Sequence, residues 1–233
     1  MPEHTLRRFD DALAALHEKV ASMGALVEKA IAQAIDAIYQ RDEKLARKVV
    51  ERDRAVNAIE VETDELARRI IALWQPAAGD LRFIFSAVKV VTDLERIGDL
   101  AEGIADQWLH TDTHPKPPAS LRALAEQAMR EVREAVDAFT RRDVDKAMRA
   151  IEQDAELDQM FRSFQREMLT YMMEDPRKIS EGLALFSIAR ALERIGDHAT
   201  NIAEMAIYMV RGHDIRHVDH EEAERMLQEN NKR

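Results

Sequence analysis

Two copies of one acidic pentapeptide are the residues of this chain best suited to chemistry. The segment Glu95–Asp99 (Glu-Arg-Ile-Gly-Asp) returns letter for letter as Glu193–Asp197, 98 residues later. In each copy the glutamate and the aspartate stand four positions apart, so a helix would carry both carboxylates on one face. Oxygen-only ligands at this density favour hard cations such as Mg²⁺, Mn²⁺ or Fe. The exact repetition also indicates a tandem duplication.

The acidic face continues along the helix predicted for each copy. At about 100° per residue, Glu102 and Asp106 lie close to the line of Glu95 and Asp99, and Glu204 lies close to that of Glu193 and Asp197, with Asn201 nearby. Apolar residues precede the acids on the same faces: Leu81, Ile84, Val88 and Val91 in the first copy, and Ile179, Phe186 and Ala189 in the second. A face that is apolar in its first half is buried there, so we expect the acids in or beside an interhelical groove.

A second acidic stripe is predicted one helix earlier in each half. Its members are Asp53, Asn57, Glu60 and Asp64 in the first half, and Asp154 and Asp158 in the second. Phe161 and Gln165 replace the last two positions in the second half. We therefore expect two separate oxygen-ligand sites, of which the first is richer in carboxylate.

Facing acidic stripes repel each other, since like charges about 4 Å apart cost several kcal/mol at an effective dielectric near 20. Raised pKa values, arginine partners or bound cations would relieve this cost. Arg96 and Arg194 are candidate partners, but each projects about 100° from the preceding glutamate. The alternative is that the acids are solvated and paired with the abundant Lys and Arg. His198 is a weaker candidate ligand, because the other copy has Leu100 there.

The apolar spacing predicts six long helices that position these stripes. They cover about 5–39, 42–73, 81–109, 120–140, 143–174 and 176–212, with the proline-rich linker Thr111–Pro118 between the third and the fourth. The pair Arg41-Asp42 recurs as Arg142-Asp143 at an offset of 101. The predicted fold is all-α, with two tandem pseudo-symmetric three-helix bundles of antiparallel helices at 5–110 and 119–212. A polar C-terminal tail covers 213–233. The glycines of the pentapeptides, Gly98 and Gly196, predict close approach of a neighbouring helix or a ligand.

Composition excludes several classes of protein. The net charge of −10 and the 5% aromatic content disfavour nucleic acid and anionic lipid as partners. The absence of cysteine excludes disulfides and thiolate sites. No apolar run is long enough to span a membrane, and no signal region is visible at the N-terminus. We expect a soluble cytoplasmic protein. Glycine-rich phosphate loops and Ser/His/Asp sets are also missing.

These motifs resemble the PhoU family, the phosphate-uptake regulators of bacteria. The resemblance rests on Glu95–Asp99, on Glu193–Glu204, on Leu16–Ile31 and on Asp154–Asp158, and it covers about residues 5–217. It implies a homodimeric cytoplasmic regulator that is not an enzyme, with one metal cluster on each acidic motif. It also implies negative regulation of the phosphate-starvation response, as an adaptor between the ATPase subunit of the phosphate transporter and a sensor histidine kinase. Membrane association would occur only through partners.

By motif match, the resemblance implies Glu95 and Asp99 with Asp53 and Asn57 as metal ligands in the first half. In the second half it implies Glu193 and Asp197 with Asp154 and Asp158. The stripes add Glu60 and Asn201 to the candidates, and the metal would be Fe, Mn, Mg or Zn. Asn57 stands opposite Asp158 in the repeat, and Gly103 opposite Asn201.

Two other functions fit the same residues. Carboxylate density would also serve a metal-dependent helical enzyme, such as a phosphohydrolase or a di-metal oxidase. Ferritin-like di-iron sites use Glu-x-x-His, and neither acidic helix carries that pair. A purely structural helical scaffold without metal is the third possibility.

Overall fold

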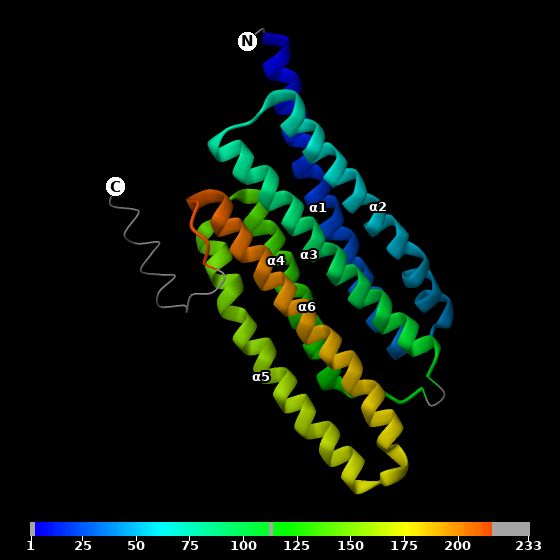
Figure 1. Ribbon diagram of the computed structural model, residues 1–233. Coiled ribbons are helices and arrows are strands. Elements are labelled where there is room, and N and C mark those ends of the chain that lie inside the picture. Colours follow the sequence, from blue (N-terminus) through cyan, green and yellow to red (C-terminus); the bar gives the residue numbers. More distant parts are fainter. Residues whose placement is uncertain (1–2, 112–113, 216–233) are drawn as a thin grey trace.

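The chain folds into six long helices in the computed structural model, which describes residues 3–111 and 114–215 (Figure 1). The helices are α1 (Glu3–Gln40), α2 (Glu43–Trp74), α3 (Ala78–Leu109), α4 (Ala119–Arg141), α5 (Val144–Glu174) and α6 (Ile179–Arg211). A 3₁₀ turn, η1 (Pro176–Lys178), joins α5 to α6. No strand occurs in these ranges, so the all-α prediction is confirmed. Most of the predicted tail, 216–233, lies outside the described residues.

Helix boundaries follow the capping residues in the sequence. Asp42 caps α2 by accepting a hydrogen bond from the Leu45 amide at 3.0 Å, and Asp143 caps α5 in the same way from Lys146 at 2.9 Å. Gly212 ends α6 with a φ of 75°, which suits glycine. The clearest difference from the sequence prediction is α3, which begins at Ala78 and not at about 81.

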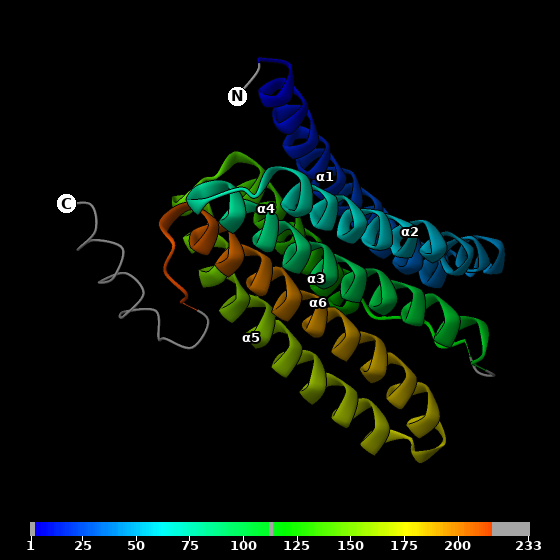
Figure 2. The ribbon, with the colours of Figure 1, turned by 45° about the horizontal axis from the view of Figure 1, so that its top comes forward.

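The six helices form two three-helix units that pack against each other. Helices α1, α2 and α3 pack on one another, as do α4, α5 and α6. Between the units, α3 packs against α6 and α1 packs against α4. Figures 1 and 2 both show α3 and α6 side by side at the centre, with α2 and α5 at opposite outer edges.

One continuous apolar core runs through both units. The largest side chains in it include Trp108, Phe139 and Phe164, all of them almost fully buried. Phe83 of α3 stacks on Phe139 of α4 with ring centroids 6.2 Å apart, so the core crosses from one unit to the other. None of the described helices combines the length and the apolar content needed to cross a lipid bilayer.

Candidate metal sites

Equivalent hydrogen bonds recur in the two units at the 101-residue offset. Arg52 donates to Gln33 at 3.2 Å in the first unit, and Gln153 donates to Glu134 at 3.0 Å in the second. Both bonds join the first helix of a unit to its second. The register of the repeat therefore holds in three dimensions, and residues of the two units can be compared position by position.

The first candidate site lies between α2 and α3. Asp53 accepts a hydrogen bond from the Asn57 side chain at 2.8 Å through Oδ2, while its Oδ1 is buried and has no partner among the described residues. The Oδ1 of Asn57 is also buried without a partner. Glu60 lies within reach of α3, where Thr92 donates to it at 3.4 Å. The site thus holds buried oxygen atoms that could accept a ligand.

Burial and mutual repulsion raise the pKa values of several carboxyls in the first site. Burial raises the pKa of Asp53, and the negative charge of Asp99 adds to this effect. The pKa of Glu95 is raised by burial first and then by Asp99 and Glu60. Burial also raises that of Glu102, with help from Asp106 and Asp53. Carboxyls of α2 and α3 are therefore close enough to act on one another, as the two facing stripes predict.

A single arginine offsets part of this negative charge. Arg96 lies 3.6 Å from Glu95 and 3.8 Å from Asp99. Its side chain therefore bends toward these acids, although its position on the helix points about 100° away from Glu95. Its side chain is 59% exposed, and water weakens a pair of this kind. One exposed guanidinium does not neutralise the whole cluster.

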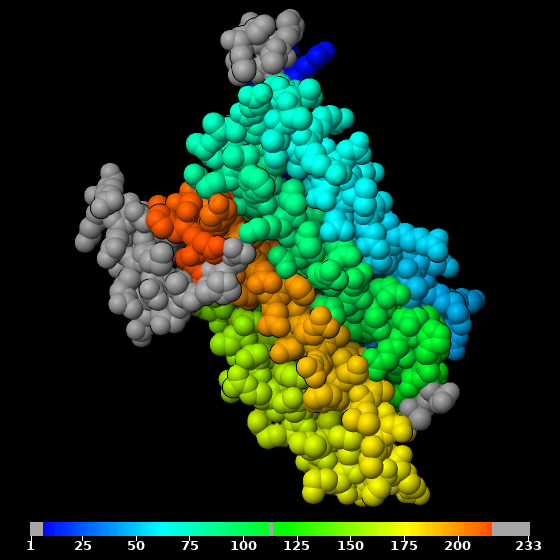
Figure 3. All heavy atoms as spheres, viewed as in Figure 1, coloured from blue at the N-terminus to red at the C-terminus, as the bar shows by residue number. Residues whose placement is uncertain are grey.

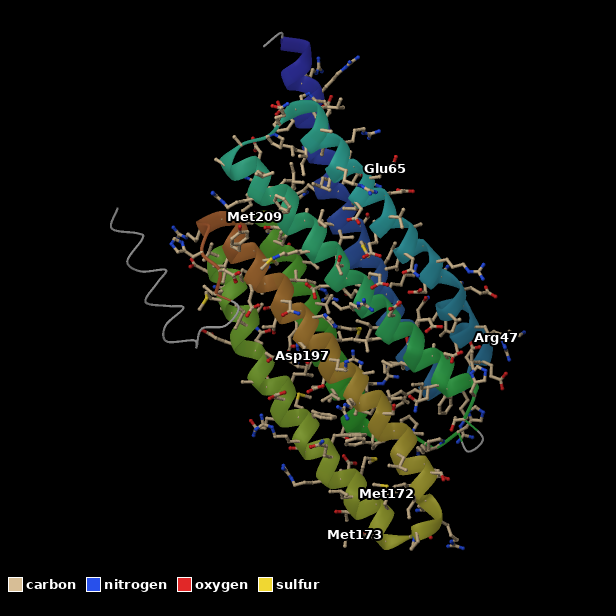
Figure 4. All side chains as sticks on the ribbon, in the orientation of Figure 1. Arg47, Glu65, Met172, Met173, Asp197 and Met209 are labelled. Atoms are coloured by element: carbon tan, nitrogen blue, oxygen red, sulfur yellow. The ribbon has the colours of Figure 1, made fainter. Side chains whose placement is uncertain are left out.

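The second candidate site lies between α5 and α6. Burial raises the pKa of Asp154 to about 6, and the charges of Asp197 and Asp158 contribute. Burial and the same neighbours raise the pKa of Glu193, and burial and Asp158 raise that of Asp197. Asp158 is paired with Arg162 at 2.7 Å. Figure 4 labels Asp197 near the middle of α6, and Figure 3 shows α6 between α3 and α5 on this face of the molecule.

The structure adds a carboxyl that the sequence prediction missed, Glu131 of α4. Its side chain is 1% exposed, and its Oε2 has no hydrogen-bond partner among the described residues. Burial raises its pKa to about 8, with a smaller contribution from Asp154. In the sequence, Glu131 could have been noticed as a polar residue within the apolar stripe formed by Leu124, Ala128, Val132 and Ala135. Glu131 makes up for the shorter acidic stripe of α5.

Gly98 and Gly196 allow close approach, as predicted from their position inside helices. A Cβ atom placed on Gly196 would lie 2.3 Å from Leu157 Cδ2, 2.8 Å from Glu131 Oε2 and 3.4 Å from Asp154 Oδ1. At Gly98 the corresponding distances are 3.0 Å to Val56 Cγ1 and 3.3 Å to Asp53 Oδ1. In both units, therefore, the second helix packs directly against the glycine. It places Asp53 beside Gly98 and Asp154 beside Gly196.

Two of the sequence candidates lie in a different place. Asn201 donates to Asp93 of α3 at 3.2 Å, and His198 is 2.9 Å from the same Asp93 oxygen. Asn201 also lines a groove between α3 and α6 together with Asp93 and Glu204. These two residues therefore join the two units. The candidates Asp53, Asn57, Glu60, Glu95 and Asp99 are carried by α2 and α3, and Asp154, Asp158, Glu193 and Asp197 by α5 and α6.

The donor chemistry of both sites fits a hard cation, although the side chains are not preassembled around one. Carboxylate and amide oxygens are the ligands such cations prefer, and buried unpartnered oxygens are present at Asp53, Asn57 and Glu131. Within residues 3–111 and 114–215, however, no three His, Asp or Glu side chains converge tightly enough to hold an ion. Binding would require side-chain rotation, and the ligand sets remain predictions.

Comparison with known proteins gives a consistent result along the chain. The model of the PhoU domain matches twice, over residues 20–107 and 121–206. The phosphate-specific transport system accessory protein PhoU of Edwardsiella tarda is 39% identical over 227 residues, which is 97% of this chain and 93% of that protein. A PhoU homolog of Pseudomonas aeruginosa is 42% identical over 221 residues, covering 94% of this chain and 91% of the relative.

Solved structures agree in fold. The crystal structure of PhoU from Pseudomonas aeruginosa superposes with a TM-score of 0.83 at 43% identity, covering 88% of this chain and all of that one. The phosphate transport system regulatory protein PhoU from Streptococcus pneumoniae superposes with a TM-score of 0.82 at 27% identity, over 88% of this chain and 98% of that one. The two-unit helical architecture is therefore shared with these proteins.

Proposed function

Because the chain belongs to the PhoU family, we propose that it is an accessory protein of a phosphate-specific transport system and regulates phosphate uptake. The relatives are named as accessory or regulatory proteins of that system and not as enzymes. They match nearly the whole chain, which supports carrying the role over to this protein.

In its finer form, the proposal is a metal-binding adaptor. It would work in the cytoplasm as a homodimer and connect the ATPase subunit of the phosphate transporter to a sensor histidine kinase. Through this connection it would repress the phosphate-starvation response when phosphate is plentiful. The negative net charge and the lack of a membrane-spanning helix in the described ranges suit a role that reaches the membrane through partners.

One observation carries the metal part of the proposal: buried carboxyls from two helices repel each other in both units. Asp53 and Asp154 occupy equivalent positions, and burial and a facing aspartate raise the pKa of each. Nearby arginines offset part of this charge, yet the pKa values of Asp53, Asp154, Glu193 and Asp197 stay raised. A cation would supply the missing charge and would link α2 to α3 and α5 to α6. The packing of each unit would then depend on metal.

Inside the sites, each residue would have a distinct part. Asp53 and Asp154 would bind from the second helix of their units, while the Glu and Asp of the pentapeptides would bind from the third. The Asn57 side chain orients Asp53 by donating to its Oδ2, which leaves Oδ1 available for an ion. Gly98 and Gly196 would keep the two helices close enough for ligands from both to meet.

A complementation experiment tests the proposal. In a strain lacking the gene, a reporter of the phosphate-starvation response should be active in phosphate-rich medium, and the intact chain should silence it. The quadruple variant Asp53→Asn, Asp99→Asn, Asp154→Asn, Asp197→Asn should fail to silence it. A matched control, Glu51→Gln with Glu65→Gln, removes two exposed acids from α2 and should behave like the intact chain.

Affinity capture and metal analysis complete this test. The intact chain, purified from phosphate-rich cells, should bring down the transporter ATPase or the kinase and should carry metal. Recovery of neither partner, together with an unchanged reporter on deletion, would refute the regulatory role. A fully functional quadruple variant would refute only the need for metal.

The carboxylate density keeps a metal-dependent phosphohydrolase as the second candidate. Phosphate-ester hydrolysis that requires added metal and disappears with Asp99→Asn would favour it over the adaptor.

A further inference from the structure

The two acidic sites also differ in the residues that the first helix of each unit places beside them. At the offset of 101, Gln127, Arg130 and Glu131 of α4 correspond to Leu26, Lys29 and Ala30 of α1. In the first unit these three residues line a cavity of about 250 Å³ that reaches Asp53, Val56 and Gly98. In the second unit, the buried Glu131 side chain extends from the equivalent position to Gly196.

Neighbouring side chains hold the Glu131 carboxyl in one orientation. Arg130 donates to Oε1 of Gln127 at 3.1 Å, and the Gln127 amide then donates to Oε1 of Glu131 at 2.9 Å. This relay satisfies one oxygen of the carboxyl and leaves Oε2 without a partner. A buried polar atom without a partner is costly, because it has lost its hydrogen bonds to water. Arrangements that persist at such a cost call for an explanation.

The unpartnered oxygen points toward the acids of the second site. Glu131 Oε2 and Asp154 Oδ1 lie within 3.4 Å of the same point, the place where a Cβ atom of Gly196 would be. Asp197 follows Gly196 in α6, and its charge acts on Asp154 from across the α5–α6 contact. Among the described residues no group donates a hydrogen bond to Oε2, and the guanidinium of Arg130 is bonded to Gln127 instead.

We propose that Glu131 is a metal ligand of the second site, supplied by α4, and that the first site has no counterpart to it. The inference rests on the proposed metal binding of the acidic motifs. The ligand is a hard divalent cation such as Mn²⁺, which would bind Glu131 Oε2 together with Asp154 and Asp197. The second site would then draw on all three helices of its unit, whereas the first draws on α2 and α3. The two sites would accordingly differ in affinity.

Titration of Mn²⁺ into a chain with only the second site tests this assignment. The background is Asp53→Asn with Asp99→Asn, which removes the central acids of the first site. Adding Glu131→Gln keeps the size of the side chain but removes the carboxylate. Calorimetry and the Mn²⁺ electron paramagnetic resonance signal should report at least a tenfold weaker site, in keeping with the roughly 10–100-fold losses seen when a metal site is perturbed.

A second variant serves as a control for folding, and a reciprocal background serves as a control for the site affected. Glu131→Ala introduces the residue that the first unit has at Ala30, where a unit of the same design folds. It should weaken Mn²⁺ binding at least as much as Glu131→Gln, while the metal-free melting temperature stays within a few degrees. In the reciprocal background, Asp154→Asn with Asp197→Asn, Glu131→Gln should leave Mn²⁺ binding to the first site unchanged.

Each remaining result contradicts the assignment. If the background binds Mn²⁺ and both Glu131 variants bind it within twofold, Glu131 is not a ligand, and the proposed metal-binding function stands. If affinity falls only in step with a lower metal-free melting temperature, the role of Glu131 is structural. If the background binds no Mn²⁺ at all, this inference and the proposed metal binding of the second site fail together.

Discussion

Several carboxyl groups of this protein are partly or fully buried beside other carboxyls. Asp53 and Asp154 face aspartates of the next helix, and Glu131 sits deeper still with one oxygen unsatisfied. Burial disfavours the charged form of each group, so their pKa values rise. Arg96 and Arg162 reach these clusters only from their exposed sides. At the residue scale the metal-free protein therefore holds protons that an ion would displace.

The stability of the metal-free protein should fall as the pH rises from about 5 to about 8. Asp154 has a pKa of about 6 and Glu131 of about 8 in the folded chain, both above their ordinary values. The folded state therefore binds protons that the unfolded chain has already lost. Their stabilising effect is complete at acidic pH and disappears as the pH passes through the folded-state values, by at most about 1.4 kcal/mol per pH unit for each group.

Urea unfolding in chelator at several pH values measures this dependence. Glu131→Gln should flatten the curve most, because its carboxyl has the larger shift, and Asp154→Asn should flatten it below pH 7. Glu65→Gln, on the exposed face of α2, serves as the control and should leave the curve as it is. A free energy of unfolding that stays constant or rises over this range would contradict the assignment of the raised pKa values.

At the scale of the elements, each site depends on how closely two helices can approach. Gly98 and Gly196 sit beneath the second helix of their units, and side chains of Val56 and Leu157 fill the space above them. Gly103 lies on the same helix as Gly98 but has no heavy atom within 4 Å of a Cβ position. Substitutions at these three glycines can therefore distinguish the effect of helix propensity on stability from the effect of helix packing.

Alanine substitution at these glycines should give a graded series of stabilities. Gly103→Ala should stabilise the chain by about 1 kcal/mol, since glycine is a poor helix former. Gly196→Ala should destabilise it by about 1–3 kcal/mol because the new methyl group meets Leu157 and Glu131. Gly98→Ala should lie between them, given its looser contacts.

Urea unfolding of the three variants in chelator gives the comparison. Equal stability of Gly196→Ala and Gly103→Ala would show that α5 can move away from α6 at no cost, which would contradict the close packing described above.

For the whole molecule, the duplication produces one cooperative body. The two units share an apolar core through Phe83 and Phe139, and they share a polar contact in which Asp93 of α3 meets His198 and Asn201 of α6. Because α3 and α6 pack on each other as well as within their units, we expect that neither unit loses its third helix independently.

Unfolding should accordingly follow one transition by every probe. The two tryptophans, Trp74 and Trp108, both lie in the first unit, whereas circular dichroism reports the helices of both. Their urea midpoints should coincide. Asp93→Ala leaves His198 and Asn201 without their shared partner and should lower both midpoints together, by about 1–3 kcal/mol in free energy. A fluorescence transition separate from the dichroism transition would instead indicate two independent units.

Local spacing was sufficient to predict the six helices and the facing of the two acidic stripes. These features depend on residues three or four apart in one helix, and duplication repeats them at offsets of 101 and 98 residues. Helix periodicity gives the direction of a side chain but not which distant helix it meets. The partnership of Asn201 and His198 with Asp93 therefore emerged only from the packing of α6 on α3. The same reason hid Glu131, which reads as a polar interruption of an apolar stripe until α4 packs against Gly196 and brings it beside Asp154.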